Sequence, residues 1–233
     1  MMADNLVVMV SIATALMLIL LLVYLQRLLR VTIADLWENE SIETPLTIGL
    51  GLVFFAILLS FINIGIVQDP VPLSINVTGA IIPLVISIYI IASKRINLIA
   101  ALASILIVVP MAFLVTSVSS EAITVNIVLW LLPVGVSGVL GYFWAKNKEQ
   151  LSSASLAYFA ASMGMFIGGD LARIPAFISA GGHSLILGGG GLMDFVFLAG
   201  PFSIAVLWVM YGSWALLKKR STFRNLIPGH GWQ

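Results

Sequence analysis

The stretch "GGDLARIPAFISAGGHSLILGGGGLMDFVFLAGP" at residues 168–201 joins two long apolar segments and carries two aspartates, Asp170 and Asp194. Acidic side chains are costly near hydrocarbon, so two of them at the ends of apolar segments need a structural or chemical reason. Four consecutive glycines, Gly188 to Gly191, lie shortly before Asp194. This stretch therefore decides how the two segments are joined and where a site can form.

The whole chain is strongly apolar. Of its 233 residues 61% are hydrophobic and 9% are charged, with a mean hydropathy of +1.12, whereas a soluble domain carries about 25% charged residues. We therefore predict a protein of the cell membrane whose main partner is the lipid bilayer. The net charge of +1 indicates no nucleic-acid partner. The sequence indicates no particular oligomeric state.

The ligands that cofactors and metals commonly need are scarce. The chain has no cysteine, which excludes disulfides, thiolate nucleophiles and cysteine-based metal sites. Its two histidines, His183 and His230, are too few and too far apart for an ordinary histidine metal cage. We predict no metal and no cofactor.

The predicted fold is all-α, a single polytopic transmembrane helix bundle over residues 1–233. A membrane span needs about 20 mostly apolar residues. Seven stretches meet this requirement: about 6–25, 46–67, 72–92, 96–116, 123–145, 152–170 and 192–216.

Basic residues predict the orientation. In a seven-span arrangement ten of them lie on one side, and Arg173 alone lies on the other. The positive-inside rule then places the N-terminus outside and the C-terminus in the cytoplasm. The ten are Arg27, Arg30, Lys94, Arg95, Lys146, Lys148, Lys218, Lys219, Arg220 and Arg224.

This topology places the polar residues of the predicted spans in one outer layer. Asn63 comes late in an outward-running span, while Asn76, Thr78 and Asn126 come early in inward-running spans. A buried polar cluster in a membrane bundle usually marks a site. Asparagines at span ends also cap helices or bond across helices, and this packing role is the alternative for them.

The two aspartates are candidate catalytic residues. Asp170 closes the sixth predicted span and Asp194 opens the seventh, so antiparallel neighbours hold both carboxyl groups at similar depth. Two carboxylates held close in a low-dielectric site cannot both ionise, so one keeps its proton. The ionised member can activate water while the neutral one protonates a carbonyl or leaving group.

Glycines precede both aspartates, and without side chains they let a substrate backbone approach closely. A glycine run is otherwise only a flexible loop. With the asparagines of the outer layer, they complete the predicted substrate-binding set: Gly168, Gly169, Gly190, Gly191, Asn76 and Asn63.

A structural reading of the aspartates stands beside the catalytic one. Arg173 follows Asp170 by three residues, so the two can pair if the helix continues that far. Asp194 can lie in the first turn of the last span, where the helix dipole favours an acid.

The segment Asp170-Leu171-Ala172-Arg173-Ile174-Pro175 resembles the first aspartate motif of prepilin peptidases. "GGGGLMDFVFLAG" resembles the second motif of the presenilin, signal-peptide-peptidase and prepilin-peptidase group, although here Leu192 and Met193 separate the glycines from Asp194. This resemblance implies an aspartyl dyad on adjacent transmembrane helices that cleaves membrane proteins or signal-peptide-like segments.

The chain as a whole resembles an uncharacterised family of archaeal and bacterial multispan proteins known only as a domain of unknown function. The residues that carry this likeness are "INVTGAIIPLVISIYII" (75–91) and the stretch quoted first.

Three functions follow from these observations. The first is an intramembrane aspartyl endopeptidase that uses Asp170 and Asp194. The second is a transporter or channel whose outer half binds a cation or small solute with the same acids. The third is a non-catalytic subunit of a membrane complex, with the acids neutralised by Arg173 or by a partner.

Overall fold

The computed structural model divides the chain into two compact units, Met1–Leu59 and Ser60–Gln233. In the first unit residues 55–59 are helical, and every element named below belongs to the second unit. The single transmembrane domain stays a prediction, and its first span, residues 6–25, lies outside the described residues. The structure describes residues 55–69, 71–144 and 150–226.

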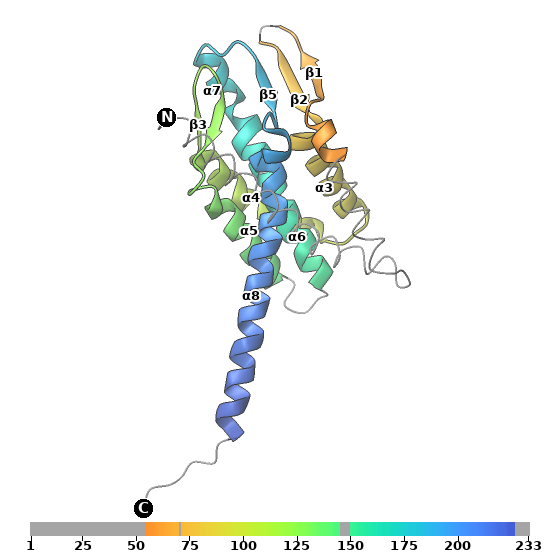
Figure 1. Cartoon of the computed structure of the whole chain (residues 1–233), viewed down its shortest axis with the longest axis vertical. Coiled ribbons are helices and arrows are strands. Elements are labelled where there is room, and N and C mark those ends of the chain that lie inside the picture. The colour runs from red at the N-terminus through yellow and green to blue at the C-terminus, as the bar shows by residue number, and fades with distance from the viewer. Residues whose placement is uncertain (1–54, 70, 145–149, 227–233) are drawn as a thin grey trace, which may run out of the picture. The chain divides into compact units, whose positions relative to one another are not determined.

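The described part of the second unit is mostly helical, as predicted (Figure 1). Four short irregular helices accompany the α-helices: η1 and η2 are wide π-helices, and η3 and η4 are tight 3₁₀-helices. The α-helices are α3 (Ile82–Ala92), α4 (Leu98–Val115), α5 (Leu131–Trp144), α6 (Gln150–Gly164), α7 (Ile174–Ser179) and α8 (Phe195–Leu226). The irregular helices are η1 (Val77–Ile81), η2 (Met165–Asp170), η3 (Leu171–Arg173) and η4 (Gly191–Met193).

Local sequence explains where these helices begin. Asn97 caps α4, because its side chain accepts a hydrogen bond from the Ile99 N–H at 2.9 Å. Pro83 lies in the first turn of α3, where a missing N–H costs nothing. Asn126 accepts hydrogen bonds from the N–H groups of Val128 and Leu129, which start the turn that leads into α5.

Five short strands among the described residues make the all-α prediction wrong in part. Figure 1 shows β5 beside β2 and β2 beside β1: β1 pairs antiparallel with β2, and β2 pairs parallel with β5. A separate hairpin joins β3 to β4. Ile and Val residues favour strands, and one end of each of the predicted spans 46–67, 72–92 and 123–145 is extended rather than helical. The strands are β1 (Asn63–Val67), β2 (Leu73–Asn76), β3 (Thr116–Val118), β4 (Ile123–Val125) and β5 (Leu185–Leu187).

Two of the described helices are long and apolar enough to cross a membrane. They are α4 and the Phe195–Ser213 part of α8, and they correspond to the predicted spans 96–116 and 192–216. The apolar helical segments Val77–Ala92 and Leu131–Trp144 are shorter. Seven spans and their orientation therefore remain predictions.

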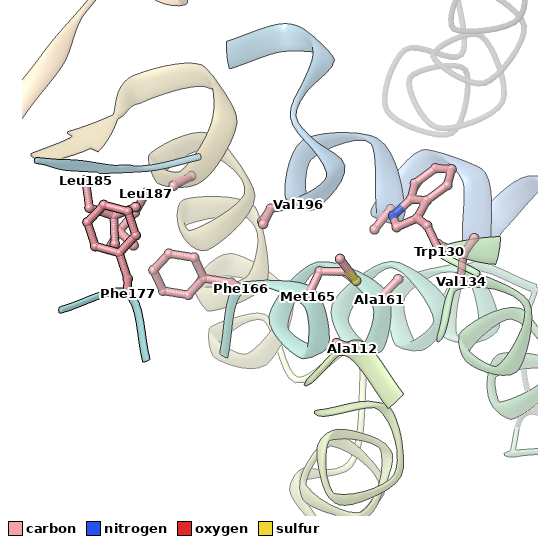
Figure 2. Packing of buried hydrophobic residues seen from close by; sticks show 12 residues of the cluster. Ala112, Trp130, Val134, Ala161, Met165, Phe166, Phe177, Leu185, Leu187 and Val196 are labelled. Atoms are coloured by element: carbon pink, nitrogen blue, oxygen red, sulfur yellow. The ribbon is translucent and has the colours of Figure 1, made fainter. Parts of the chain in front are cut away.

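One hydrophobic cluster joins the sheet to the helices. In Figure 2, Phe177, Leu185 and Leu187 lie together at one side, and the ring of Phe166 is turned toward them. The cluster continues through α6 and α8 to Trp130, whose ring packs edge-on against two phenylalanines of α8. This packing fixes β5 and the end of α6 in one core.

Small residues let α6 and α8 approach closely. A methyl group added at Gly200 of α8 would overlap the ring of Tyr158 and lie 2.7 Å from the Ser162 hydroxyl of α6. Gly212 lies on the same helix, and nothing lies within 4 Å of its would-be Cβ. Gly200 is therefore packed against α6, whereas Gly212 has free space beside it, so the two positions allow a controlled comparison.

We predict that Gly200→Ala destabilises the protein by about 1–3 kcal/mol, because overpacking forces the helices apart. Gly212→Ala should be neutral or stabilising by up to about 1 kcal/mol, since alanine favours helix more than glycine. Thermal unfolding of both variants in one detergent measures the difference. Equal unfolding temperatures would contradict the packing of α6 on α8.

Candidate functional site

The glycine loop, Gly188 to Gly191, is where the site forms. It follows β5 directly and leads through η4 to α8. Gly188 has φ +67° and Gly191 has φ +58°, a left-handed conformation that side-chain-bearing residues rarely adopt. The glycines therefore permit the tight return of the chain from the sheet to the start of α8.

Asp170 reaches this loop from the end of η2. Its side chain is half-buried, and Oδ2 accepts a hydrogen bond from the Gly188 N–H at 3.1 Å. Asp170 is the last residue of a π-helix, a rare widened turn that occurs often at functional sites. The 3₁₀ turn of η3 follows at once.

Asp194 reaches the same loop from the start of α8. Oδ1 accepts a hydrogen bond from the Val196 N–H at 2.8 Å, and Oδ2 accepts one from the Gly190 N–H at 3.1 Å. The first bond caps α8, which agrees with the predicted position of Asp194 at the start of the last helix. The second ties its carboxylate to the glycine loop.

The structure therefore brings the two predicted aspartates together on one loop. Their carboxylates accept hydrogen bonds from N–H groups only two residues apart. Gly79 of η1 closes the arrangement, because a methyl group there would overlap the Gly188 carbonyl and lie 3.0 Å from Cβ of Asp194. Two half-buried carboxylates on one short loop disfavour each other's ionisation.

Arg173 does not pair with Asp170 as the structural reading expected. Its guanidinium lies over the Phe113 ring, with Cζ 3.6 Å from the ring centroid. Nε donates to the Thr116 hydroxyl at 3.0 Å, and Nη2 donates to the carbonyls of Phe113 and Thr116. The 3₁₀ turn after Asp170 breaks the helical spacing that pairing required.

The predicted asparagines hold the backbone near the site. Asn76 is buried; it accepts a hydrogen bond from the Gly79 N–H at 2.8 Å and donates to Asn63 at 2.9 Å and to the Ser60 carbonyl at 2.8 Å. Asn63 itself is exposed. Asn76 thus caps η1 and positions Gly79 beside Asp194, which is the capping alternative considered for it.

The predicted glycines divide into two groups. Gly190 belongs to the loop that binds Asp194, and Gly191 packs beside the Ser60 side chain. Gly168 and Gly169 face α4 instead: a methyl group on Gly168 would overlap the Val109 carbonyl, and one on Gly169 would lie 3.3 Å from Thr116. These two glycines bring Asp170 close to α4.

Two contributors were missed from the sequence. Gly79 lies in the segment 75–91 that carries the family resemblance, but nothing in that segment predicts a contact with the glycine loop, and only the fold reveals it. Ser60 Oγ accepts a hydrogen bond from the Leu192 N–H at 3.1 Å, across 132 residues of sequence. Nothing in the local pattern predicts such a distant contact.

Among the residues that the structure describes, no group of three or more His, Asp or Glu side chains is arranged to hold a metal ion.

The fold and the site define a mostly helical protein with two half-buried aspartates on one glycine loop. Residues 52–207 match the family model described as "Protein of unknown function (DUF1614)", and because this is more than half of the chain, the chain belongs to that family. Neither the curated proteins nor the solved structures contain a match.

We predict that Gly188→Ala disrupts the site. The substitution adds a left-handed strain of about 1–2 kcal/mol and places a methyl group 2.6 Å from the Ala80 N and 2.8 Å from the Ala80 Cβ. Gly181→Ala is the control, because its φ of +79° imposes the same strain in open space.

The expected result is that Gly188→Ala lowers the unfolding free energy by about 1–3 kcal/mol more than Gly181→Ala does, through overpacking. Thermal or chemical unfolding of the two variants measures this. If both lose the same stability, η1 does not pack on the glycine loop.

Proposed function

We propose that this protein is a multi-pass cell-membrane aspartyl endopeptidase whose dyad is Asp170 and Asp194. The observation that carries the proposal is the shared loop: the Gly188 and Gly190 N–H groups bind one carboxylate each at 3.1 Å. An acid–base pair needs two carboxyl groups at one place in different protonation states. The motif resemblance at both aspartates supports the same activity.

The proposed reaction is hydrolysis of a peptide bond. The ionised aspartate takes a proton from water as the water oxygen attacks the carbonyl carbon, while the protonated aspartate gives its proton to the carbonyl oxygen. The aspartate that took the water proton then gives it to the amide nitrogen, while the other aspartate takes a hydroxyl proton back from the gem-diol. The C–N bond breaks, an acid and an amine leave, and both aspartates return to their starting protonation states. No metal or cofactor takes part.

Hydrogen bonding suggests which aspartate has which role. N–H donors favour the charged form of a carboxylate. Asp194 accepts two such bonds and Asp170 accepts one. We therefore assign Asp194 as the general base and Asp170 as the initial proton donor.

The sheet supports an extended substrate. β5 lies at an edge of the described three-stranded sheet and runs directly into the glycine loop. An extended peptide can add to such an edge through backbone hydrogen bonds. A membrane-protein or signal-peptide-like segment bound there would pass beside both aspartates.

The membrane setting of the proposal rests on composition and on the two candidate spans. With 9% charged residues the chain lacks a surface suited to water. Seven spans, with the N-terminus outside, put the dyad in the outer half of the bilayer.

The cation or solute transporter is the second candidate. Two neighbouring carboxylates favour it, and so does a buried hydroxyl, that of Ser87, with no hydrogen-bond partner in the described structure. Among the other buried hydroxyls of the described residues, Ser104 and Ser203 bond to carbonyls of their own helices, whereas Ser153 of α6 bonds to the Tyr211 hydroxyl of α8. A non-catalytic subunit role remains the third candidate.

We predict that Asp170→Asn and Asp194→Asn each lower peptide-bond cleavage about 10²–10⁴-fold, the usual contribution of general acid–base catalysis. Asparagine keeps one acceptor oxygen, which serves the single bond that Asp170 accepts and the cap bond of Asp194, although the Gly190 bond of Asp194 is then lost. It caps helices as well as aspartate does. Both variants should therefore stay folded. Cleavage of a tagged single-span membrane peptide in proteoliposomes is the measurement.

Asp69→Asn is the matched control, since Asp69 is an exposed acid in the described chain and should leave cleavage unchanged. No cleavage by the unmodified protein, with ion-dependent solute uptake abolished by Asp170→Asn, would replace the protease by the transporter. If both Asn variants fail to fold, the two aspartates are needed for structure, and the non-catalytic subunit is the candidate that is left.

A further inference from the structure

Arg173 ties the segment that ends in Asp170 to the end of α4. Three of its hydrogen bonds go to Phe113 and Thr116, and its guanidinium stacks on the Phe113 ring. The last carbonyls of a helix lack partners within the helix and carry partial negative charge. A forked, planar cation satisfies two of them together.

The rest of the segment is pressed against the same helix. Gly168 lies against the Val109 carbonyl, and Gly169 lies beside the Thr116 side chain. The chain from Gly168 to Arg173 is thus docked on α4 at both ends, and Asp170 lies between the two contacts. The Asp170 carboxylate accepts its hydrogen bond from the Gly188 N–H, which belongs to the glycine loop and not to α4.

The backbone between these contacts is held in an irregular state. The π turn of η2 contains more residues than an α turn, and the 3₁₀ turn of η3 contains fewer. If this segment rewound by one residue into regular α-helix, Asp170 would rotate by about 100° about the helix axis, since a turn has 3.6 residues. The carboxylate would then leave the glycine loop.

We propose that Arg173 is the positioning residue of Asp170: its attachment to the end of α4 holds the π-to-3₁₀ junction and so keeps Asp170 on the glycine loop opposite Asp194. The inference rests on the proposed dyad. Arg173 acts through the backbone and not through an ion pair, because its donors go to Phe113 and Thr116.

Cross-linking tests this geometry without any activity. The chain has no cysteine, so Asp170→Cys with Asp194→Cys introduces the only two thiols, and a short bifunctional thiol reagent reports whether they meet. We expect Arg173→Gln to lower the cross-linking rate severalfold, and Arg173→Lys to restore it in part. Arg95→Gln is the control, because Arg95 also stacks on an aromatic ring, that of Tyr89 at 5.5 Å, and should leave cross-linking unchanged.

Thr116→Val is the second variant and keeps the test decisive if Arg173→Gln does not fold. It removes the hydroxyl that binds Nε but preserves the shape beside Gly169, and it should also slow cross-linking. If Arg173→Gln folds and its cross-linking rate is unchanged, the inference is overturned. If only Thr116→Val folds, an unchanged cross-linking rate in that variant overturns it. A change in stability alone does not affect either conclusion.

Cleavage separates this inference from the proposed function. If the protein is a protease, Arg173→Gln in the cysteine-free chain should lower kcat up to about 10²-fold through misplacement of Asp170, with little change in KM. Arg173-dependent cross-linking without any cleavage would keep the positioning role and reject the protease. Cleavage that is insensitive to Arg173→Gln would reject the positioning role and keep the protease.

Discussion

The backbones of η1 and the glycine loop touch at Gly79 and Gly188, and the candidate site depends on that contact. No side chain larger than hydrogen fits between them, because a methyl group on either residue would overlap the other segment. The loop N–H groups that bind Asp170 and Asp194 are therefore held in place from three directions. β5 anchors the loop to the sheet, η1 packs on its side, and α8 begins directly after it.

The apolar pattern predicts the long helices well and the sheet poorly. The predicted span 96–116 differs from α4 by two residues at its start and one at its end. β5 is only three apolar residues long, and periodicity cannot distinguish such a run from a helical segment. Its pairing with β2 joins residues more than a hundred positions apart. Local propensity contains no information about such a pairing.

The proximity of Asp170 and Asp194 could be predicted from the sequence, because chain direction alone places the end of one helix near the start of the next. The direction of the Arg173 side chain was not predicted, since it depends on whether the turns after Met165 are α, π or 3₁₀. Regular α spacing would put Arg173 on the same face as Asp170, but η2 and η3 change the number of residues per turn between them. A single unusual turn thus converts an expected ion pair into a contact with α4.

Structural and catalytic roles are not exclusive for Asp194. Each carboxylate oxygen has more than one lone pair, so the bond that caps α8 leaves capacity for a proton or a water. Capping alone, however, does not require an acid, because asparagine and serine cap equally well. Two acids on one loop instead repel each other unless a proton is shared. Exchange of both aspartates for asparagine would remove that repulsion, but an asparagine at 194 has a single acceptor oxygen and could keep only one of the two bonds that Asp194 accepts, from the Val196 and Gly190 N–H groups. Asp194 therefore has a structural reason to be an acid, and this reason is compatible with the proton transfer proposed for the pair.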